Sequence, residues 1–134
     1  MTPRPLLERF YAEVWNRGDE ATARAILDPR FRFRGSLGVT ADDVDGFLAY
    51  VRSVRAALAD YCCIIDDMIE GEGRAAARMT FTGVHRGTLL GVAATGRAVS
   101  WSGAAFFTVA DARISELWVL GDLDSLRRQL LNTT

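Results

Sequence analysis

The chain has 134 residues, about half of them apolar, which is enough for one domain with its own hydrophobic core. Its formal net charge is −1 and no block of like charges occurs, so the basic stripe that a nucleic-acid partner needs is absent. All 16 basic residues are arginine. Without lysine, neither Schiff-base chemistry nor a phosphate-binding loop of the lysine-containing type is available.

The sequence contains few potential metal ligands and no pair of cysteines suited to a disulfide. His85 is the single histidine, which excludes the paired-histidine zinc motifs, and we expect no metal and no cofactor. Cys62 and Cys63 are adjacent, and a disulfide between neighbours would require strained backbone geometry. Two free thiols, an N-terminus without a signal peptide and no apolar run of membrane-spanning length predict a cytoplasmic protein with no membrane partner.

The first third of the chain predicts two helices and a strand. Apolar residues recur at helical spacing over 6–15 and indicate an amphipathic helix, which Gly18 ends. Asp19 is placed to cap a second, alanine-rich helix that runs through Leu27. Pro29 ends that helix, and the alternation of arginine and phenylalanine over 30–34 predicts a short strand.

A third and longer helix follows a glycine-containing loop. Apolar residues at helical spacing over 44–58 mark its buried face. Thr40 is the expected N-cap, which would place Asp42 and Asp43 favourably in the first turn.

The second half of the chain predicts a sheet and a closing helix. Four strands are expected, with a tight turn at 71–73 and another around Asp111, and the last helix carries three leucines. Helices that precede a run of antiparallel strands indicate an α+β fold, with the helices on one face of a curved antiparallel sheet. The strands are 61–70, 74–85, 99–109 and 114–120, and the leucines are Leu123, Leu126 and Leu130.

The last strand is apolar on both faces. Leu117 and Val119 point to one side, and Trp118 and Leu120 point to the other. The helices can cover only one of these faces, so a second subunit is the expected cover of the other. The sequence therefore predicts a homodimer.

Motifs along nearly the whole chain resemble those of the SnoaL-like polyketide cyclases. The glycine-punctuated stretch around His85 is similar to the family's hallmark segment, and the ends of the first helix, the long helix, the last strand and the closing helix agree in order and spacing. The segments are Phe10-Tyr11, Trp15 to Asp19, Ala59-Asp60, Gly83 to Gly87, Gly91, Thr95-Gly96-Arg97, Ile114 to Trp118, Asp122 and Gln129-Leu130.

The resemblance implies a fold and a range of reactions. Members share the cone-shaped α+β barrel of the nuclear transport factor 2-like superfamily, with a deep apolar pocket. Several close rings of polyketide intermediates by intramolecular aldol reaction without metal or cofactor, so we expect such a cyclase acting on a bulky apolar substrate. A hydroxylase, an isomerase, an epoxide-opening enzyme and a non-catalytic ligand-binding domain remain alternatives, because one fold supports many functions.

Asp122 is the expected acid/base residue. The resemblance matches it to the cyclases' catalytic aspartate and places its face of the last strand, shared with Trp118 and Leu120, in the pocket. A carboxylate in an apolar cavity has its charged form disfavoured and becomes a better base. The alternative role is an ordinary N-cap of the last helix.

His85 and Arg78 are the other polar candidates. His85 could donate to an enolate oxygen or shuttle a proton, or it could simply bond a backbone carbonyl. Arg78 could neutralise a substrate oxyanion or pair with Asp122, or it could form a salt bridge on the outer face. Strict strand alternation puts the two residues on opposite faces, so both reach the pocket only if the strand bulges, for which Gly83 is a suitable place.

Three aromatic side chains are candidate pocket walls. Trp15, Tyr50 and Trp118 could stack on a planar polycyclic substrate. Aromatic residues at helical spacing also serve as plain core, and that is the expected role of Tyr50.

Overall fold

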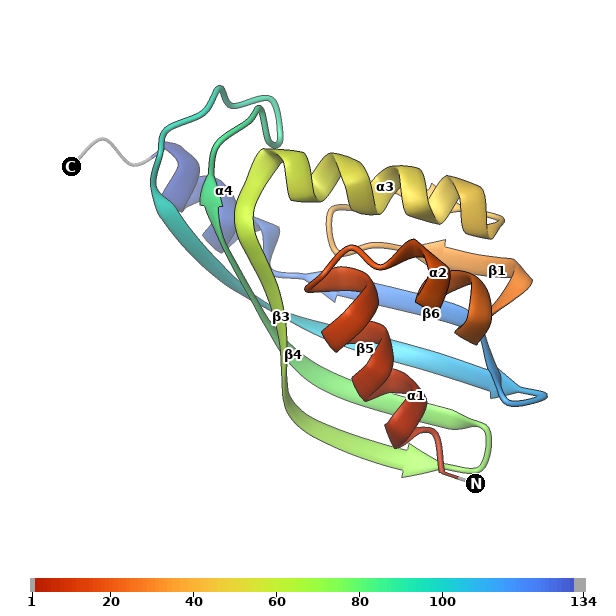
Figure 1. Cartoon of the computed structure of the whole chain (residues 1–134). Coiled ribbons are helices and arrows are strands. Elements are labelled where there is room, and N and C mark those ends of the chain that lie inside the picture. Colours follow the sequence, from red (N-terminus) through yellow and green to blue (C-terminus); the bar gives the residue numbers. More distant parts are fainter. Residues whose placement is uncertain (1, 132–134) are drawn as a thin grey trace.

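The computed structural model describes residues 2–131, which form four α-helices, a π-helix and six strands. Figure 1 shows α1, α2 and α3 together on one face of a strongly curved sheet, with α4 at the end of the sheet beyond α3. The elements in chain order are α1 (Arg4–Arg9), the π-helix η1 (Phe10–Trp15), α2 (Glu20–Ile26), β1 (Leu27–Arg34), β2 (Thr40–Ala41), α3 (Val44–Ala57), β3 (Leu58–Gly71), β4 (Arg74–His85), β5 (Ala98–Ala110), β6 (Arg113–Gly121) and α4 (Leu123–Leu131).

The six strands form one mixed sheet in the order β2-β1-β6-β5-β4-β3. Neighbouring strands run antiparallel except β1 and β6, which are parallel. The expected α+β fold is confirmed, but the sheet is mixed and does not close into a barrel. A tight hairpin cannot join parallel strands, and β1 and β6 meet this condition because α3 and the strands β3 to β5 lie between them in sequence.

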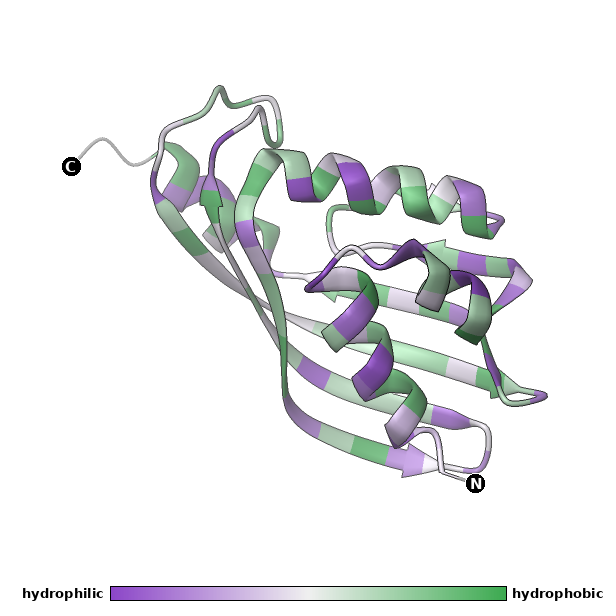
Figure 2. Cartoon of the chain, viewed as in Figure 1, coloured by the Kyte–Doolittle hydropathy of each residue, from purple (hydrophilic) through white to green (hydrophobic). Residues whose placement is uncertain are grey.

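Alternation along the strands gives the sheet two different faces. The inner face, which the helices cover, carries buried side chains such as Phe33, Phe81 and Leu117, whereas the residues between them point outward and are more exposed. Figure 2 shows this as alternating hydrophobic and hydrophilic bands along the strands. The core therefore lies between the inner face and helices α1, α2 and α3.

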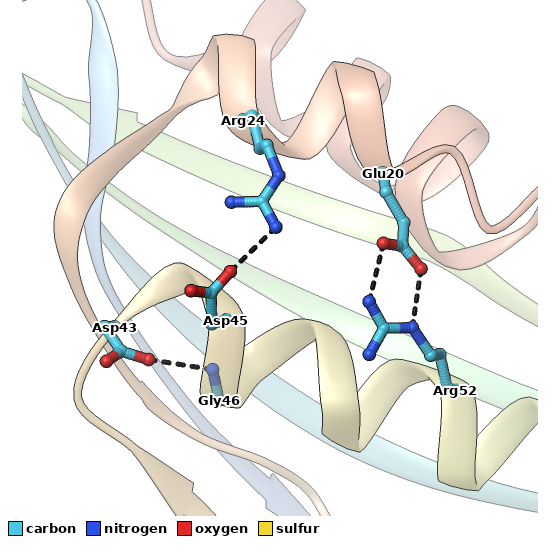
Figure 3. Close-up of polar contacts among 6 residues, drawn as sticks. All are labelled: Glu20, Arg24, Asp43, Asp45, Gly46 and Arg52. Atoms are coloured by element: carbon cyan, nitrogen blue, oxygen red, sulfur yellow. Dashed lines mark hydrogen bonds and ion pairs between the residues drawn. The ribbon is translucent and has the colours of Figure 1, made fainter.

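Ion pairs on the solvent side join α2 to α3 (Figure 3). Glu20 accepts two hydrogen bonds of 2.7 Å from Arg52, and Arg24 donates to Asp45 over 2.7 Å. These side chains are well exposed, so water and salt screen each pair and it contributes little to stability. The position of α3 depends mainly on its buried face.

Two local predictions need correction. The expected single helix over 6–15 is a short α-helix followed by η1, in which the amide of Asn16 bonds the carbonyl of Tyr11, five residues earlier. This wider turn brings the adjacent pairs Phe10-Tyr11 and Val14-Trp15 into the core. Thr40 does not cap α3. It lies in β2, and Asp43 is the cap, its carboxylate accepting from Gly46 N–H over 2.8 Å.

The last helix closes one end of the sheet. Asp122 precedes α4, and its carboxylate accepts from the Ser125 N–H over 3.1 Å, the bonding pattern of an N-cap. Further along α4, Gln129 exchanges hydrogen bonds with the backbone of Ser100 on β5. Leu126 and Leu130 are buried beneath the helix.

Candidate functional site

A small cavity lies between the helices and the inner face of the sheet. Two of the three candidate wall residues line it: Trp15, and Tyr50, whose expected role was plain core. Their rings lie edge-on at a centroid distance of 5.8 Å. The ring of Trp15 also meets Tyr61 edge-on at 5.5 Å. The lining residues are Tyr11, Trp15, Phe33, Ser36, Tyr50, Tyr61, Cys63, Phe81, Leu117 and Val119.

Local contacts hold these walls in place. The side-chain amide of Asn16 bonds both the N–H and the carbonyl of Cys63, which ties the end of η1 to β3 next to Trp15. The Trp15 carbonyl accepts from Arg55 of α3 over 2.7 Å. The Tyr50 hydroxyl packs directly against Gly35. A Cβ atom at position 35 would lie only 2.7 Å from the hydroxyl oxygen, so the absence of a side chain there makes room for Tyr50.

The polar groups of the cavity are proton donors and not bases. Burial raises the pKa values of Tyr11 and Tyr61 well above their ordinary range, and it raises the pKa of Tyr50 to about 12. Burial likewise raises the pKa of the Cys63 thiol. At neutral pH all four groups are therefore protonated and uncharged.

Two buried donors in this region have no hydrogen-bond partner. One is the hydroxyl of Tyr11, which lines the cavity. The other is the indole N–H of Trp101, which neighbours Phe81 in the register of β4 and β5 and whose ring is 5.4 Å from the Phe81 ring. Buried polar groups are paired in the great majority of cases, so these two unpaired donors are exceptions, and only the Tyr11 hydroxyl belongs to a residue that lines the cavity.

The cavity contains neither a carboxylate nor space for a large ligand. The inner positions of the end of β6 are Leu117, Val119 and Gly121, so that strand brings no acid/base side chain inward. The cavity holds about 20 Å³, which is room for roughly one water molecule. The deep pocket that the resemblance implies is filled here by aromatic side chains.

His85 lies on the inner face but is fully buried and bonded on both ring nitrogens. The backbone N–H of Thr95 donates to Nδ1 over 3.2 Å, which leaves Nε2 as the protonated nitrogen, 3.2 Å from the Val92 carbonyl. The ring thus holds the loop between β4 and β5 in place. A catalytic role of His85 stays a prediction, and a proton shuttle there would have to break one of these bonds.

We expect His85→Ala to lower the free energy of unfolding by about 2 kcal/mol or more, because Thr95 N–H and the Val92 carbonyl lose their buried partner. Urea denaturation measures the change. Arg86→Ala, at the exposed neighbouring position, is the control and should unfold like the parent. Equal stability of the two variants would show that the ring does not hold the loop.

Arg78 and Asp122 share a groove on the outer face. The groove holds about 500 Å³ and is lined largely by apolar side chains, among them Ile69, Phe106 and Leu120. Arg78 on β4 pairs with Ala104 on β5, which in turn pairs with Leu120 on β6. The backbone N–H of Asp122, just after β6, donates to the Ser102 carbonyl on β5. Arg78 and Asp122 do not form an ion pair, and the nearby Asp67 lines the same groove.

The expected side of the last strand needs correction. Trp118 and Leu120 are 44% and 46% exposed on the outer face, and Asp122 is exposed beyond them, so none of the three lies in the inner cavity. The bulge that would have brought Arg78 inward does not occur, because β4 and β5 pair without a register shift. Alternation alone therefore separates Arg78 from His85.

Four inner residues were missed by the sequence reasoning. Tyr11 lies on the apolar stripe of the first predicted helix, Tyr61 and Trp101 lie in predicted strands, and Ser36 lies in the predicted glycine-containing loop, so none was singled out. Alternation with Cys63 and Phe81 could have placed Tyr61 and Trp101 on one face, but the absence of a partner for Trp101 is visible only in three dimensions.

Within residues 2–131, no three histidine, cysteine or acidic side chains gather closely enough to hold a metal ion. None of the helices in the same range is long and apolar enough to cross a membrane.

Comparisons with solved structures place this chain among proteins of one fold. TsrD from Streptomyces laurentii is 30% identical, with a TM-score of 0.85 over 96% of this chain and 93% of its own. IdmH, a proposed polyketide cyclase from Streptomyces antibioticus, is 26% identical, with a TM-score of 0.83 over 96% and 97% of the two chains.

AclR, a proposed hydroxylase from Streptomyces galilaeus, shares the fold at 24% identity, with a TM-score of 0.80 over 95% of this chain and 79% of its own. No curated protein matched the sequence. The profile described as SnoaL-like polyketide cyclase matches residues 6–130. The chain therefore belongs to the SnoaL-like polyketide cyclase family.

Proposed function

We propose that the chain is a cofactor-independent cyclase of natural-product biosynthesis that closes a ring by an intramolecular aldol-type reaction, with Asp122 as the acid/base. The observation that carries this proposal is the outer groove, in which a carboxylate and a guanidinium line one largely apolar hollow. Its volume of about 500 Å³ is in the range of small-molecule sites and would admit the bulky apolar substrate expected from the sequence.

The groove could perform the reaction in three steps. The Asp122 carboxylate takes a proton from a carbon between two carbonyls of the substrate, and the Arg78 guanidinium stabilises the enolate oxygen that forms. The enolate carbon then attacks a second carbonyl of the same molecule and forms the new carbon–carbon bond. The resulting alkoxide takes the proton back from Asp122, so the enzyme is regenerated. Asp122→Asn, argued in the Discussion, tests this role.

A second candidate function, a non-catalytic ligand-binding domain, is supported by the inner cavity. Trp15 and Tyr50 form aromatic walls there and the Tyr11 hydroxyl is unpaired, yet no carboxylate or other base lines it. Such a site would hold a ligand only after its aromatic side chains moved apart, because it now has room for roughly one water molecule, and it has no group to remove a proton. Turnover of a polycarbonyl substrate without added cofactor favours the enzyme, whereas tight binding without turnover favours the binding domain.

Tryptophan fluorescence distinguishes the two locations. Trp15 lines the inner cavity, whereas Trp118 packs against Phe106, which lines the outer groove, so a planar ligand quenches mainly the tryptophan nearer to it. For a bulky ring-fused ligand we expect Trp118→Phe to abolish most of the quenching and Trp15→Phe to leave it. The reverse result would move the large-ligand site inside the molecule.

The outer face also supports the predicted homodimer. One row of paired residues crosses five strands of the sheet and consists of Ile69, Ala76, Phe106, Trp118 and Arg34. In this row, the side chains of Ile69 and Phe106 are 72% and 42% exposed. We name Ile69, Phe106, Trp118 and Leu120 the outer patch.

Charges of both signs border the outer patch. Asp67 and Arg78 are neighbours in one row of the sheet, and Arg34 and Glu116 lie on β1 and β6 at its other side. In a two-fold dimer each surface meets its own copy, so a patch that carries both signs can pair acidic with basic groups. A second copy over this patch would also enclose the groove and remove water from it.

We expect Phe106→Arg to convert the dimer to a monomer, because each copy would bury an uncompensated guanidinium group in the interface. Sedimentation velocity at micromolar concentration measures the change. Val39→Arg is the matched control, since Val39 is similarly exposed, at 47%, but lies outside the outer patch. A parent protein that sediments as a monomer would end the dimer proposal.

We also propose a cytoplasmic location. Cys62 and Cys63 are both free thiols, and persistent free thiols are typical of a reducing compartment.

A further inference from the structure

We propose that a hollow at the β1–β2 edge of the outer face binds a planar aromatic monocarboxylate through the guanidinium group of Arg34. We name it the edge hollow. It holds about 380 Å³, and its walls include Arg32, Arg34, Thr40, Asp42, Glu116 and Trp118. The inference goes beyond the proposed ring closure, because it depends neither on Asp122 nor on the outer groove.

Arg34 has a guanidinium group that its surroundings fix without neutralising it. Nη1 donates to the backbone carbonyls of Gly35 and Val119, and Cζ lies 5.3 Å from the centre of the Trp118 ring. The residue is half-buried, and within residues 2–131 no carboxylate forms an ion pair with it. A partly buried charge without a counter-charge is unfavourable, and the carboxylate of a ligand would supply one.

A second arginine lies next to Arg34 on the same strand. Arg32 precedes it by two residues, so alternation places both side chains on the outer face of β1. The ion pair between Arg32 and Glu116 has an N–O distance of 3.6 Å, and the two side chains are 73% and 47% exposed. Such a surface pair contributes little, so a ligand carboxylate can take the place of Glu116 beside Arg32.

Trp118 gives the edge hollow an aromatic surface. Thr40, Arg34 and Trp118 are neighbours in one row across β2, β1 and β6. Trp118 is 44% exposed, so part of its indole ring is open to a planar ligand. On its β5 side the ring packs against Phe106 at 6.0 Å, which separates the edge hollow from the outer groove. A volume of about 380 Å³ is near the lower end of small-molecule sites and suits a ligand of one or two rings.

Charge limits the ligand to a single carboxylate. Glu116 and Asp42 balance the two arginines, so the formal charge of the edge hollow is zero before a ligand binds. The Nη2 and Nε groups of Arg34 make no hydrogen bond within residues 2–131 and can donate to both oxygens of one carboxylate. A dianion such as hydrogen phosphate or a dicarboxylate would bring a second negative charge close to Glu116 and Asp42, which repel it.

Calorimetry on the full chain with 1-naphthoate and methyl 1-naphthoate tests the charge requirement, since the two probes share one ring system and only the first is an anion. We expect 1-naphthoate to bind about 10-fold more tightly than the ester or better, because only the anion forms a charge-assisted pair with Arg34. Added salt should weaken the binding of 1-naphthoate. Inorganic phosphate should not displace it.

Glu116→Gln is the most informative variant, because the inference predicts a gain. Removing the carboxylate frees Arg32 and ends the repulsion of the ligand, so the affinity for 1-naphthoate should rise about 3-fold or more. Arg34→Gln should lower that affinity about 10-fold or more and leave the affinity for the ester unchanged. Arg30→Gln is the matched control, because Arg30 is an exposed arginine of the same strand outside the edge hollow, and it should bind like the parent.

Arg34 also bonds two backbone carbonyls, so its variant can lose the fold as well as the ligand. Arg32→Gln is therefore measured beside it, since Arg32 makes only the surface pair with Glu116. It should weaken the binding of 1-naphthoate about 3-fold. If circular dichroism shows Arg34→Gln unfolded, the gain in Glu116→Gln and the loss in Arg32→Gln decide the question.

Four results would overturn the inference: 1-naphthoate does not bind, it binds no more tightly than its ester, Glu116→Gln fails to raise its affinity, or Arg78→Gln lowers its affinity while a folded Arg34→Gln does not. The last result would place the anion in the outer groove. Ring closure is assayed separately on polycarbonyl substrates. Turnover without binding of 1-naphthoate would reject this inference alone, and binding of 1-naphthoate without turnover would reject the cyclase proposal alone.

Discussion

Asp122→Asn is expected to lower turnover of a polycarbonyl substrate by about 100-fold or more, because a positioned acid/base typically contributes 10²–10⁴-fold. The melting temperature should not change. Asparagine caps helices about as well as aspartate, and its side-chain oxygen can still accept from the Ser125 N–H, which lies 3.1 Å from the carboxylate. What the amide cannot do is take a proton at neutral pH. Initial rates and thermal midpoints on the same purified variant measure both quantities.

Asp124→Asn is the matched control for this experiment. Asp124 is an exposed carboxylate in the first turn of the same helix, paired with Arg128, and it does not line the groove. It should keep the parent rate. If Asp122→Asn melts normally and also turns over at the parent rate, then Asp122 is only the helix cap, and the candidate acid/base becomes His85, for which His85→Gln is the parallel variant.

Phe47→Ala is expected to lower the free energy of unfolding by about 3–5 kcal/mol, the usual cost of truncating a fully buried phenylalanine. Phe47 of α3 is fully buried and contacts the rings of Trp15 and Phe33, two walls of the inner cavity. The midpoint of thermal unfolding should fall by roughly 10–20 °C. Ligand binding in the cavity should weaken as well, because Trp15 loses its support.

Phe106→Ala provides the comparison. It removes the same atoms from a residue that is 42% exposed on the outer face, so its effect on the unfolding of the single chain should stay below about 1 kcal/mol. A similar loss in both variants, compared at a concentration where the protein is monomeric, would mean that the outer patch contributes to the fold of the chain itself.

The fold could be predicted from the sequence because the local patterns, such as helical spacing, helix caps and turn glycines, agree with one another. Helical spacing located α3 within one residue of its end, and Asp19 is the cap of α2, its carboxylate accepting from the Thr22 N–H over 3.1 Å. The glycine-containing turn that joins β3 to β4 was likewise predicted, with Gly73 at a φ of +68°. Thr40 was mistaken for a cap because a threonine and an aspartate near a helix start look alike in sequence.

The candidate site could be predicted only in part from the sequence. Trp15 and Tyr50 could be placed in the interior because they lie on the apolar stripes of helical segments, and both line the cavity. Whether an interior aromatic residue is core or pocket wall depends on side chains from other elements. For Tyr50 these are the loop at Gly35 and the strand residue Tyr61, neither of which is near it in sequence.

By itself the sequence determined which residues of the last strand belong together. The period of two puts Trp118 and Leu120 on one face and Leu117 and Val119 on the other, and the structure has the same division. Which face points inward is a different matter, because both are apolar and alternation does not distinguish them. Helices α1, α2 and α3 cover one face of the sheet (Figure 1), and the buried Leu117 lies on that face. This leaves Trp118, Leu120 and the capping carboxylate of Asp122 on the outer face.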